Sequence, residues 1–272
     1  MTSNQISLPF PASTVLLVRD SIAGPEVFMV MRNRKIDFAY GALVFPGGKL
    51  DKHDSNPELL ELCRSQGLIF DDLAGRICGI RETFEEAGIL LARDETNDQM
   101  INGERCAELT LRYRDALHSG KITLLEILKK EKIKLACDKL ILFARWVTPS
   151  SFSRRFDARF YISKTPADYV AKHDGIESVS SMWTSPITAL EEADEGRATL
   201  VFATRMNLTK IAHFDNVSNL IEETEKREVV TVEPEISQNR DEVTYKIPIE
   251  AGYGITEFIE YGGPSLKIKS QK

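Results

Sequence analysis

Arg81-Glu82-Thr83-Phe84-Glu85-Glu86-Ala87-Gly88-Ile89 concentrates acidic side chains on one face of a helix. Because positions i, i+3 and i+4 share a helix face, Glu82, Glu85 and Glu86 would project three carboxylates into one small patch. Another face of the same helix carries an apolar stripe at helical spacing, formed by Leu73, Ile77, Ile80 and Phe84. The pattern predicts a helix over about 72–87 that packs one side in a core and presents negative charge on the other.

The acidic face has two interpretations. A run of charge is usually a solvated helix surface, whereas a cluster of hard oxygen ligands is what Mg²⁺ or Mn²⁺ binds, often with phosphate oxygens. Gly88 stands at the expected C′ position, where a positive φ ends a helix sharply. Upstream, Phe45-Pro46-Gly47-Gly48 is a turn whose glycines let the backbone approach a ligand or another segment closely. These two features favour the metal-binding interpretation.

The glycine turn and the acidic helix together resemble the signature of the Nudix hydrolases, a glycine turn followed by Arg-Glu-apolar-x-Glu-Glu-x-Gly-apolar. Thr83 replaces the usual apolar residue. Gly48 and Arg81 are further apart than in the family, so the resemblance requires an insertion of about twenty residues, over about 51–71, which a surface loop tolerates at modest entropic cost. The family's intermediate glutamate has no clear equivalent, because Leu73 occupies its place counting back from Arg81.

The resemblance implies a role for each residue of the signature. Glu85 and Glu86 would be the principal ligands of Mg²⁺ or Mn²⁺, and Glu82 would be a third ligand or a base. Arg81 would pair with a carboxylate and orient it rather than touch the substrate, and a purely structural ion pair is the alternative. The glycines of the turn, Gly47 and Gly48, would bring the backbone against the substrate.

A catalytic base need not lie on the acidic helix. Members of the family often take one from a loop after a later strand, shortly before a tryptophan, and Glu177 precedes Trp183 in this way. Glu177 would then be the base or another metal ligand. The alternative is an ordinary exposed loop residue.

Basic residues offer contacts for a substrate's outer phosphates. Arginine binds phosphate through two parallel hydrogen bonds, so Arg155 and Arg159 would receive such phosphates if they share a strand face. Ion pairs with Asp157 are the alternative, and Arg32 is a further basic candidate. This segment, with the glycine turn and the acidic helix, resembles the Nudix subgroup that includes the peroxisomal coenzyme A diphosphatases.

That likeness makes coenzyme A or acyl-coenzyme A the leading substrate, cleaved to 4′-phosphopantetheine, or its acyl form, and adenosine 3′,5′-bisphosphate. NADH, ADP-ribose and nucleotide sugars remain open because they share the same cleavable diphosphate bond. A Nudix-fold sensor that binds a nucleotide without hydrolysing it is an alternative of a different class. The chain keeps Glu82, Glu85 and Glu86 despite their mutual repulsion, which favours the enzyme.

The order of expected elements predicts an α/β protein. Strands on both sides of a helical middle favour a mixed sheet sandwiched by helices, which is also the α/β/α fold that the resemblance implies. We expect a Nudix domain over 1–227, with helical insertions at about 51–71 and 104–135 that pack together, and a C-terminal β extension over 228–272. Strands are expected at 13–19, 27–32, 42–45, 89–91, 140–148, 155–162 and 176–183.

Composition excludes some classes of partner. The 272 residues carry a net charge of -6, which argues against a general nucleic-acid binder. No apolar run is long enough to span a membrane, and no export signal is visible, so a cytoplasmic location is expected. In that setting the cysteines are expected to be reduced. The expected partner is a small-molecule nucleoside diphosphate derivative. The sequence leaves open whether the chain forms a homodimer.

Overall fold

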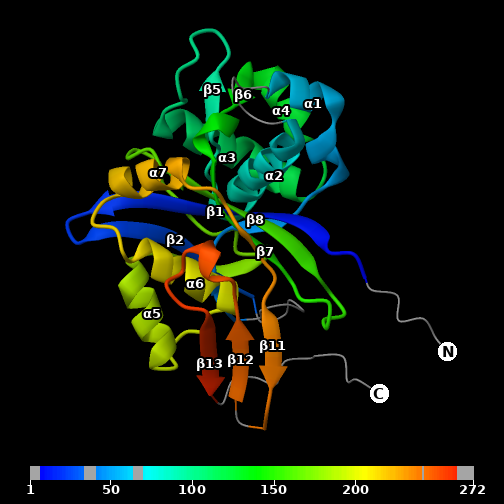
Figure 1. Cartoon of the computed structure of the whole chain (residues 1–272). Helices are drawn as coiled ribbons and strands as arrows, with labels where there is room; N and C mark the ends of the chain where they lie inside the picture. The colour runs from blue at the N-terminus through cyan, green and yellow to red at the C-terminus, as the bar shows by residue number, and fades with distance from the viewer. Residues whose placement is uncertain (1–6, 34–40, 64–69, 241, 262–272) are drawn as a thin grey trace, which may run out of the picture.

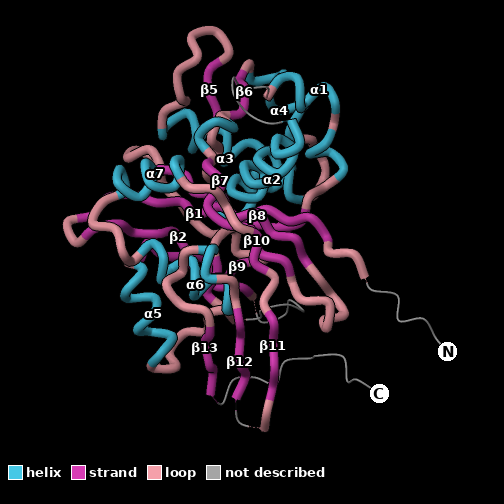
Figure 2. Tube along the Cα trace, viewed as in Figure 1, coloured by secondary structure: helices cyan, strands magenta, loops and turns pink. Residues whose placement is uncertain are grey.

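The computed structural model describes residues 7–33, 41–63, 70–240 and 242–261, with only the backbone of residues 70 and 71. Its largest sheet runs through the middle of the molecule (Figure 2) and has the order β10-β7-β8-β1-β2-β3, with β4 beside β1 and β9 beside β2. The pairs β1–β8 and β10–β7 are parallel and the others antiparallel, so the predicted mixed sheet is confirmed. The strands are β1 (Phe10–Ser21), β2 (Gly24–Arg32), β3 (Leu43–Val44), β4 (Gly47–Lys49), β7 (Ile141–Val147), β8 (Phe156–Lys164), β9 (Ser178–Thr184) and β10 (Thr231–Val232).

Helices cover both faces of this sheet, because successive residues of β1 point to opposite sides. Val15 and Leu17 belong to one buried cluster, and Leu16 and Val18 belong to a second. Figure 1 shows α1 to α4 gathered above the sheet and α5 and α6 below it, which confirms the predicted α/β/α sandwich. The helices are α1 (Pro57–Leu62), α2 (Phe70–Ala87), α3 (Gly103–His118), α4 (Leu124–Glu131), α5 (Pro186–Asp194), α6 (Phe202–Ile211) and α7 (Val217–Lys226).

Helix α2 is the predicted acidic helix, and its apolar stripe is buried as expected. Two glycines bring it close to the sheet: a Cβ on Gly79 would lie 3.0 Å from Val15, and one on Gly75 would lie 2.6 Å from the hydroxyl of Tyr161. The helix ends where predicted, at Gly88, whose φ is 68° and whose N–H donates to the carbonyl of Phe84. This packing fixes the helix end that carries the glutamates.

The two predicted insertions pack together on the α2 side of the sheet. Residues of α1, α3 and α4 share one buried cluster with α2, and Lys129 of α4 forms an ion pair with Glu58 of α1. The strand expected at 89–91 is wrong: these residues are fully buried but lie outside any strand. The strand follows them as β5 (Ala92–Asp94), paired with β6 (Ile133–Leu135). An apolar run signals burial and does not by itself signal a strand.

The C-terminal segment forms a separate three-stranded antiparallel sheet at the opposite end from the inserted helices (Figure 1). It consists of β11 (Glu235–Gln238), β12 (Glu242–Lys246) and β13 (Glu257–Tyr261). Tyr253 attaches this segment to the body, because its hydroxyl accepts from Nε1 of Trp146 at 2.9 Å and donates to Asn207 at 2.8 Å. Among the described residues, no helix is long and apolar enough to cross a membrane.

Candidate active site

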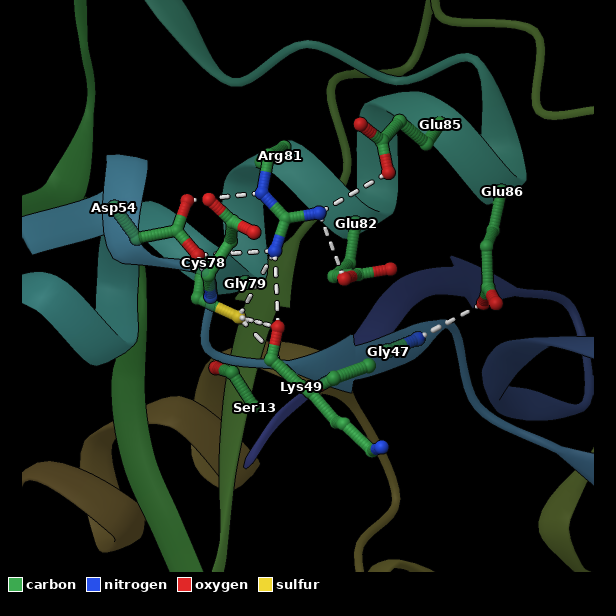
Figure 3. A network of polar contacts seen from close by, with 12 residues as sticks. Ser13, Gly47, Lys49, Asp54, Cys78, Gly79, Arg81, Glu82, Glu85 and Glu86 are labelled. Atoms are coloured by element: carbon green, nitrogen blue, oxygen red, sulfur yellow. Dashed lines mark hydrogen bonds and ion pairs between the residues drawn. The ribbon is translucent and has the colours of Figure 1, made fainter. Parts of the chain in front are cut away.

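Arg81 lies among the acidic side chains of α2 (Figure 3). Its Nε and Nη2 donate to the two carboxylate oxygens of Asp54, each at 2.9 Å. Its Nη1 donates to Glu82 at 2.8 Å and to Glu85 at 3.1 Å, and Nη2 also donates to the carbonyl of Lys49 at 3.0 Å. One guanidinium therefore holds three carboxylates and the strand β4 in a fixed relation.

Asp54 is a member of this network that sequence reasoning missed. It lies in a short 3₁₀-helix, η1 (Lys52–Ser55), and its side chain is 1% exposed. Counting back from Arg81 leads to Leu73, because the insertion separates the two acidic elements. Counting forward from Gly48 reaches Asp54, so the insertion begins after this residue and not at about residue 51 as predicted. Asp54 therefore provides a carboxylate in the place of the family's intermediate glutamate, for which the sequence alone offered no clear equivalent.

The glycine segment is a strand, β4, and both glycines are needed for close approach. The N–H of Gly47 donates to Oε2 of Glu86 at 2.9 Å. A Cβ on Gly47 would lie 2.4 Å from the carbonyl oxygen of Ser13 in β1, and one on Gly48 would lie 2.4 Å from Oε1 of Glu82. Because glycine has no side chain, the β1 backbone can lie close to Gly47 and the Glu82 carboxylate can lie close to Gly48.

The glutamates of α2 carry negative charge that Arg81 only partly offsets. Burial raises the pKa of Glu82 to about 7, against the lowering effect of Arg81. Burial likewise raises the pKa of Glu85, and it holds the pKa of Glu86 well above its usual range, with repulsion from Glu82 adding to the effect. Carboxyls in this state favour a further cation beside them.

The donor atoms fit a magnesium or manganese ion, since these ions prefer carboxylate oxygens. The ligand set is not preassembled, however: within the described part of the chain, no three Asp, Glu, His or Cys side chains are grouped closely enough to hold a metal. Arg81 engages Glu82 and Glu85, and Glu86 turns toward Gly47 (Figure 3). Binding would require these carboxylates to change rotamer. The assignment of Glu82, Glu85 and Glu86 as ligands stays a prediction.

Glu177 and Arg32 lie next to this helix end. Glu177 precedes β9, and its charge raises the pKa of both Glu85 and Glu86. Its Oε2 is 3.9 Å from Nη2 of Arg32. The buried Nε of Arg32 makes no hydrogen bond with the described residues, so this donor is available to an anionic group. The structure thus brings both predicted residues to the acidic patch.

Arg155 does not lie at the acidic patch, and its expected role is corrected. It is buried just before β8, where it donates to the carbonyls of Thr148 at 2.8 Å and Ser7 at 3.0 Å, and to Glu233 at 2.9 Å. These contacts join three chain segments. Arg155 is therefore a structural residue rather than a phosphate ligand.

Arg159 is also distant from the predicted metal ligands. A Cβ on Gly75 would lie 3.6 Å from its Nη1, which places it about 15 Å along α2 from Glu85 at 1.5 Å per residue. The alternative, an ion pair of these arginines with Asp157, is not found either, because Asp157 binds Arg145 through two hydrogen bonds. The predicted phosphate site on this strand is not supported.

Comparison with known proteins identifies the family. The protein-family model described as the NUDT19 Nudix domain matches residues 63–201, just over half of the chain. The chain belongs to the Nudix hydrolases. The matched part of this Nudix domain includes α2 and Glu177.

Two relatives named acyl-coenzyme A diphosphatase NUDT19 are similar to this Nudix hydrolase. The Xenopus laevis protein is 24% identical over 265 residues, covering 82% of this chain and 70% of its own. The human protein is 24% identical over 236 residues, covering 72% of this chain and 63% of its own. A Nudix hydrolase structure from Alicyclobacillus acidocaldarius has a TM-score of 0.65 and 24% identity, and covers 80% of this chain and 97% of that one. This structural likeness supports the fold.

Gly48→Ala is expected to lower the activity of this Nudix hydrolase about 100-fold by displacing Glu82, as small misplacements of reacting groups can do. The colliding atoms end a flexible side chain, so the melting temperature should change little. Steady-state kinetics and thermal melting of Gly48→Ala, Glu82→Gln and the double variant check this prediction. If Gly48→Ala acts through Glu82, it should lower the activity of the Glu82→Gln variant little further. A double variant whose loss of activity equals the product of the two single losses would refute the explanation.

Mg²⁺ is expected to stabilise this Nudix hydrolase, and to do so more strongly as pH rises. The folded chain retains the protons of Glu82 and Glu86 above the pH at which the unfolded chain loses them, so these groups weaken the metal-free fold as pH rises. Metal ligands must be deprotonated, so the Mg²⁺-induced rise in melting temperature should be small near about pH 5.5 and larger near about pH 8. Thermal melting with and without Mg²⁺ measures this. An equal rise at both pH values would contradict it.

Proposed function

We propose that this Nudix hydrolase cleaves the diphosphate bond of a nucleoside diphosphate derivative, with coenzyme A or acyl-coenzyme A as its substrate. The main support for this type of reaction is the group of glutamates on α2, which are buried, only partly neutralised and held against the strand β4. The name acyl-coenzyme A diphosphatase, carried by the two relatives above, supports the substrate. The chain spans 63 to 70% of the lengths of these relatives.

A diphosphate is inert in water because its oxygens repel an incoming nucleophile, so charge must be neutralised and water positioned. Glu85 and Glu86 would hold Mg²⁺ or Mn²⁺, with Glu82 as a third ligand or as the base. The bound cation would supply neutralisation of the diphosphate charge. Arg32 would donate to a phosphate oxygen through Nε, which has no hydrogen-bond partner among the described residues.

The oxygen of the attacking water would bond to one phosphorus, and the bond from that phosphorus to the bridging oxygen would break, so that the bridging oxygen leaves with the other phosphate. A carboxylate would take the proton that the water loses. Two residues are candidates for this base. Glu82, with a pKa of about 7, suits proton transfer near neutral pH if it is not a metal ligand. Glu177 is the other, because it lies beside the same carboxylates without belonging to α2.

A substrate panel tests the proposal. Coenzyme A, acyl-coenzyme A, NADH, ADP-ribose and a nucleotide sugar are incubated separately with the protein and Mg²⁺ or Mn²⁺, and the products are identified by mass. The expected products from coenzyme A are 4′-phosphopantetheine and adenosine 3′,5′-bisphosphate, formed with the highest kcat/KM of the panel. Preference for another compound would overturn the substrate, and binding without turnover of any would favour a nucleotide sensor. A cytoplasmic location and a homodimer stay predictions.

A further inference from the structure

The inserted helix α3 meets the C-terminal end of α2. Cys106, Thr110 and Arg114 follow one another at intervals of four residues, so they share a face of α3. Oγ1 of Thr110 donates to the carbonyl of Gly88 at 2.9 Å, and Sγ of Cys106 lies 3.6 Å from the same oxygen. Nε of Arg114 donates to the carbonyl of Glu85 at 2.7 Å. One face of the insertion thus binds the Glu85 carbonyl, which the last turn of α2 leaves without an intrahelical partner, and the carbonyl of Gly88 just beyond the helix.

Arg114 also reaches the loop that carries Glu177. Its Nη1 donates to the carbonyl of His173 at 3.5 Å. The backbone reinforces this link, because the N–H of Lys172 donates to the carbonyl of Ala87 at 2.9 Å. The same guanidinium therefore spans the two elements that bring carboxylates to the acidic patch.

The environment of Arg114 distinguishes it from a surface arginine. Its Nη2 is buried and makes no hydrogen bond with the described residues. Nη1 would lie 3.3 Å from a Cβ on Gly88, so a side chain at this position would crowd the guanidinium. A cation there is favoured by the helix dipole. The buried Nη2 and the close approach to Gly88 both lie at the junction of α2 and the Glu177 loop.

We propose that Arg114 is a positioning residue, through which the insertion sets the turn bearing Glu85 and Glu86 against the Glu177 loop for metal binding. The inference rests on the part of the proposed function that makes Glu85 and Glu86 ligands of a divalent cation. It does not depend on the substrate. It gives the inserted helix a role in the reaction rather than in packing alone.

The positioning role of Arg114 is tested with two variants, Arg114→Gln and Arg114→Lys, and with a matched control, Arg112→Gln. Arg112 lies on an exposed part of the same helix and pairs with Glu108 and Glu131. Mn²⁺ binding is measured by calorimetry without substrate, and Mg²⁺ dependence, kcat and KM are measured with substrate. Arg114→Gln should raise the Kd for Mn²⁺ about 10- to 100-fold, the range seen for residues that orient metal ligands, and should lower kcat more than it changes KM.

The lysine variant separates position from charge. Lysine keeps the positive charge but cannot span both carbonyls, so Arg114→Lys should show an intermediate loss, and Arg112→Gln should bind Mn²⁺ like the unaltered protein. An unchanged Kd in folded Arg114→Gln, or tighter binding because a nearby positive charge is gone, would overturn the proposal. If Arg114→Gln does not fold, a normal Kd in Arg114→Lys overturns it. Failure of coenzyme A cleavage with Mn²⁺ binding as expected would refute the substrate and leave this inference standing.

Discussion

Glu85→Gln and Glu86→Gln are each expected to lower kcat by about 10²- to 10³-fold, the loss typical of removing one electrostatic contact to a transition state. Glutamine preserves the volume of the side chain, and its carbonyl oxygen can still accept the N–H of Gly47 at position 86. Because the pKa of both carboxyls is raised, removing either charge should leave the metal-free fold equally stable or more stable.

Kinetics at saturating Mg²⁺ and thermal melting without metal check both halves of this prediction. Glu104→Gln, at an exposed position of α3, is the matched control and should behave like the unaltered protein. Near-normal turnover in both active-site variants would remove the basis for their assigned roles. A large fall in melting temperature would instead indicate that these carboxylates hold the fold together.

Arg81→Gln is expected to destabilise the fold by about 3–5 kcal/mol, because removing one partner of a buried ion pair leaves the other charge uncompensated. Asp54 would lose both of its hydrogen bonds to the guanidinium, and Glu82 and Glu85 would lose theirs. Activity should fall as well, since the same contacts orient the glutamates. Denaturant unfolding measures the loss.

The double variant Arg81→Gln with Asp54→Asn should recover part of that loss, because the buried carboxylate is then neutral. Arg197→Gln, which removes an exposed pair with Glu192, should leave the free energy of unfolding nearly unchanged. If Arg81→Gln were as mild as this surface change, the guanidinium could not be the centre of the network.

Local pattern was sufficient to predict the acidic helix. The buried stripe of α2 and the positive φ at Gly88 both follow from the 3.6-residue period and from a conformation that glycine adopts most readily. The glycine segment was recognised for the same reason, although it forms a strand rather than a simple turn.

Contacts between distant segments account for what the sequence alone did not reveal. Asp54 pairs with Arg81 across an insertion, so its role appears only once the chain folds back. Arg155 has the chemistry of a phosphate ligand, but the carbonyls of Ser7 and Thr148 already use its donors. The role of Arg114 likewise depends on how the inserted α3 lies against α2, which no local period encodes.

A manganese soak of crystals, located by anomalous scattering, tests most directly whether α2 holds a divalent cation. The account predicts a peak contacted by carboxylate oxygens of Glu85 and Glu86, with Glu82 or Glu177 adjacent, and with these side chains rotated from their metal-free positions. A soak that leaves Glu82 and Glu85 on Arg81 and Glu86 on Gly47, with no peak among them, would contradict it.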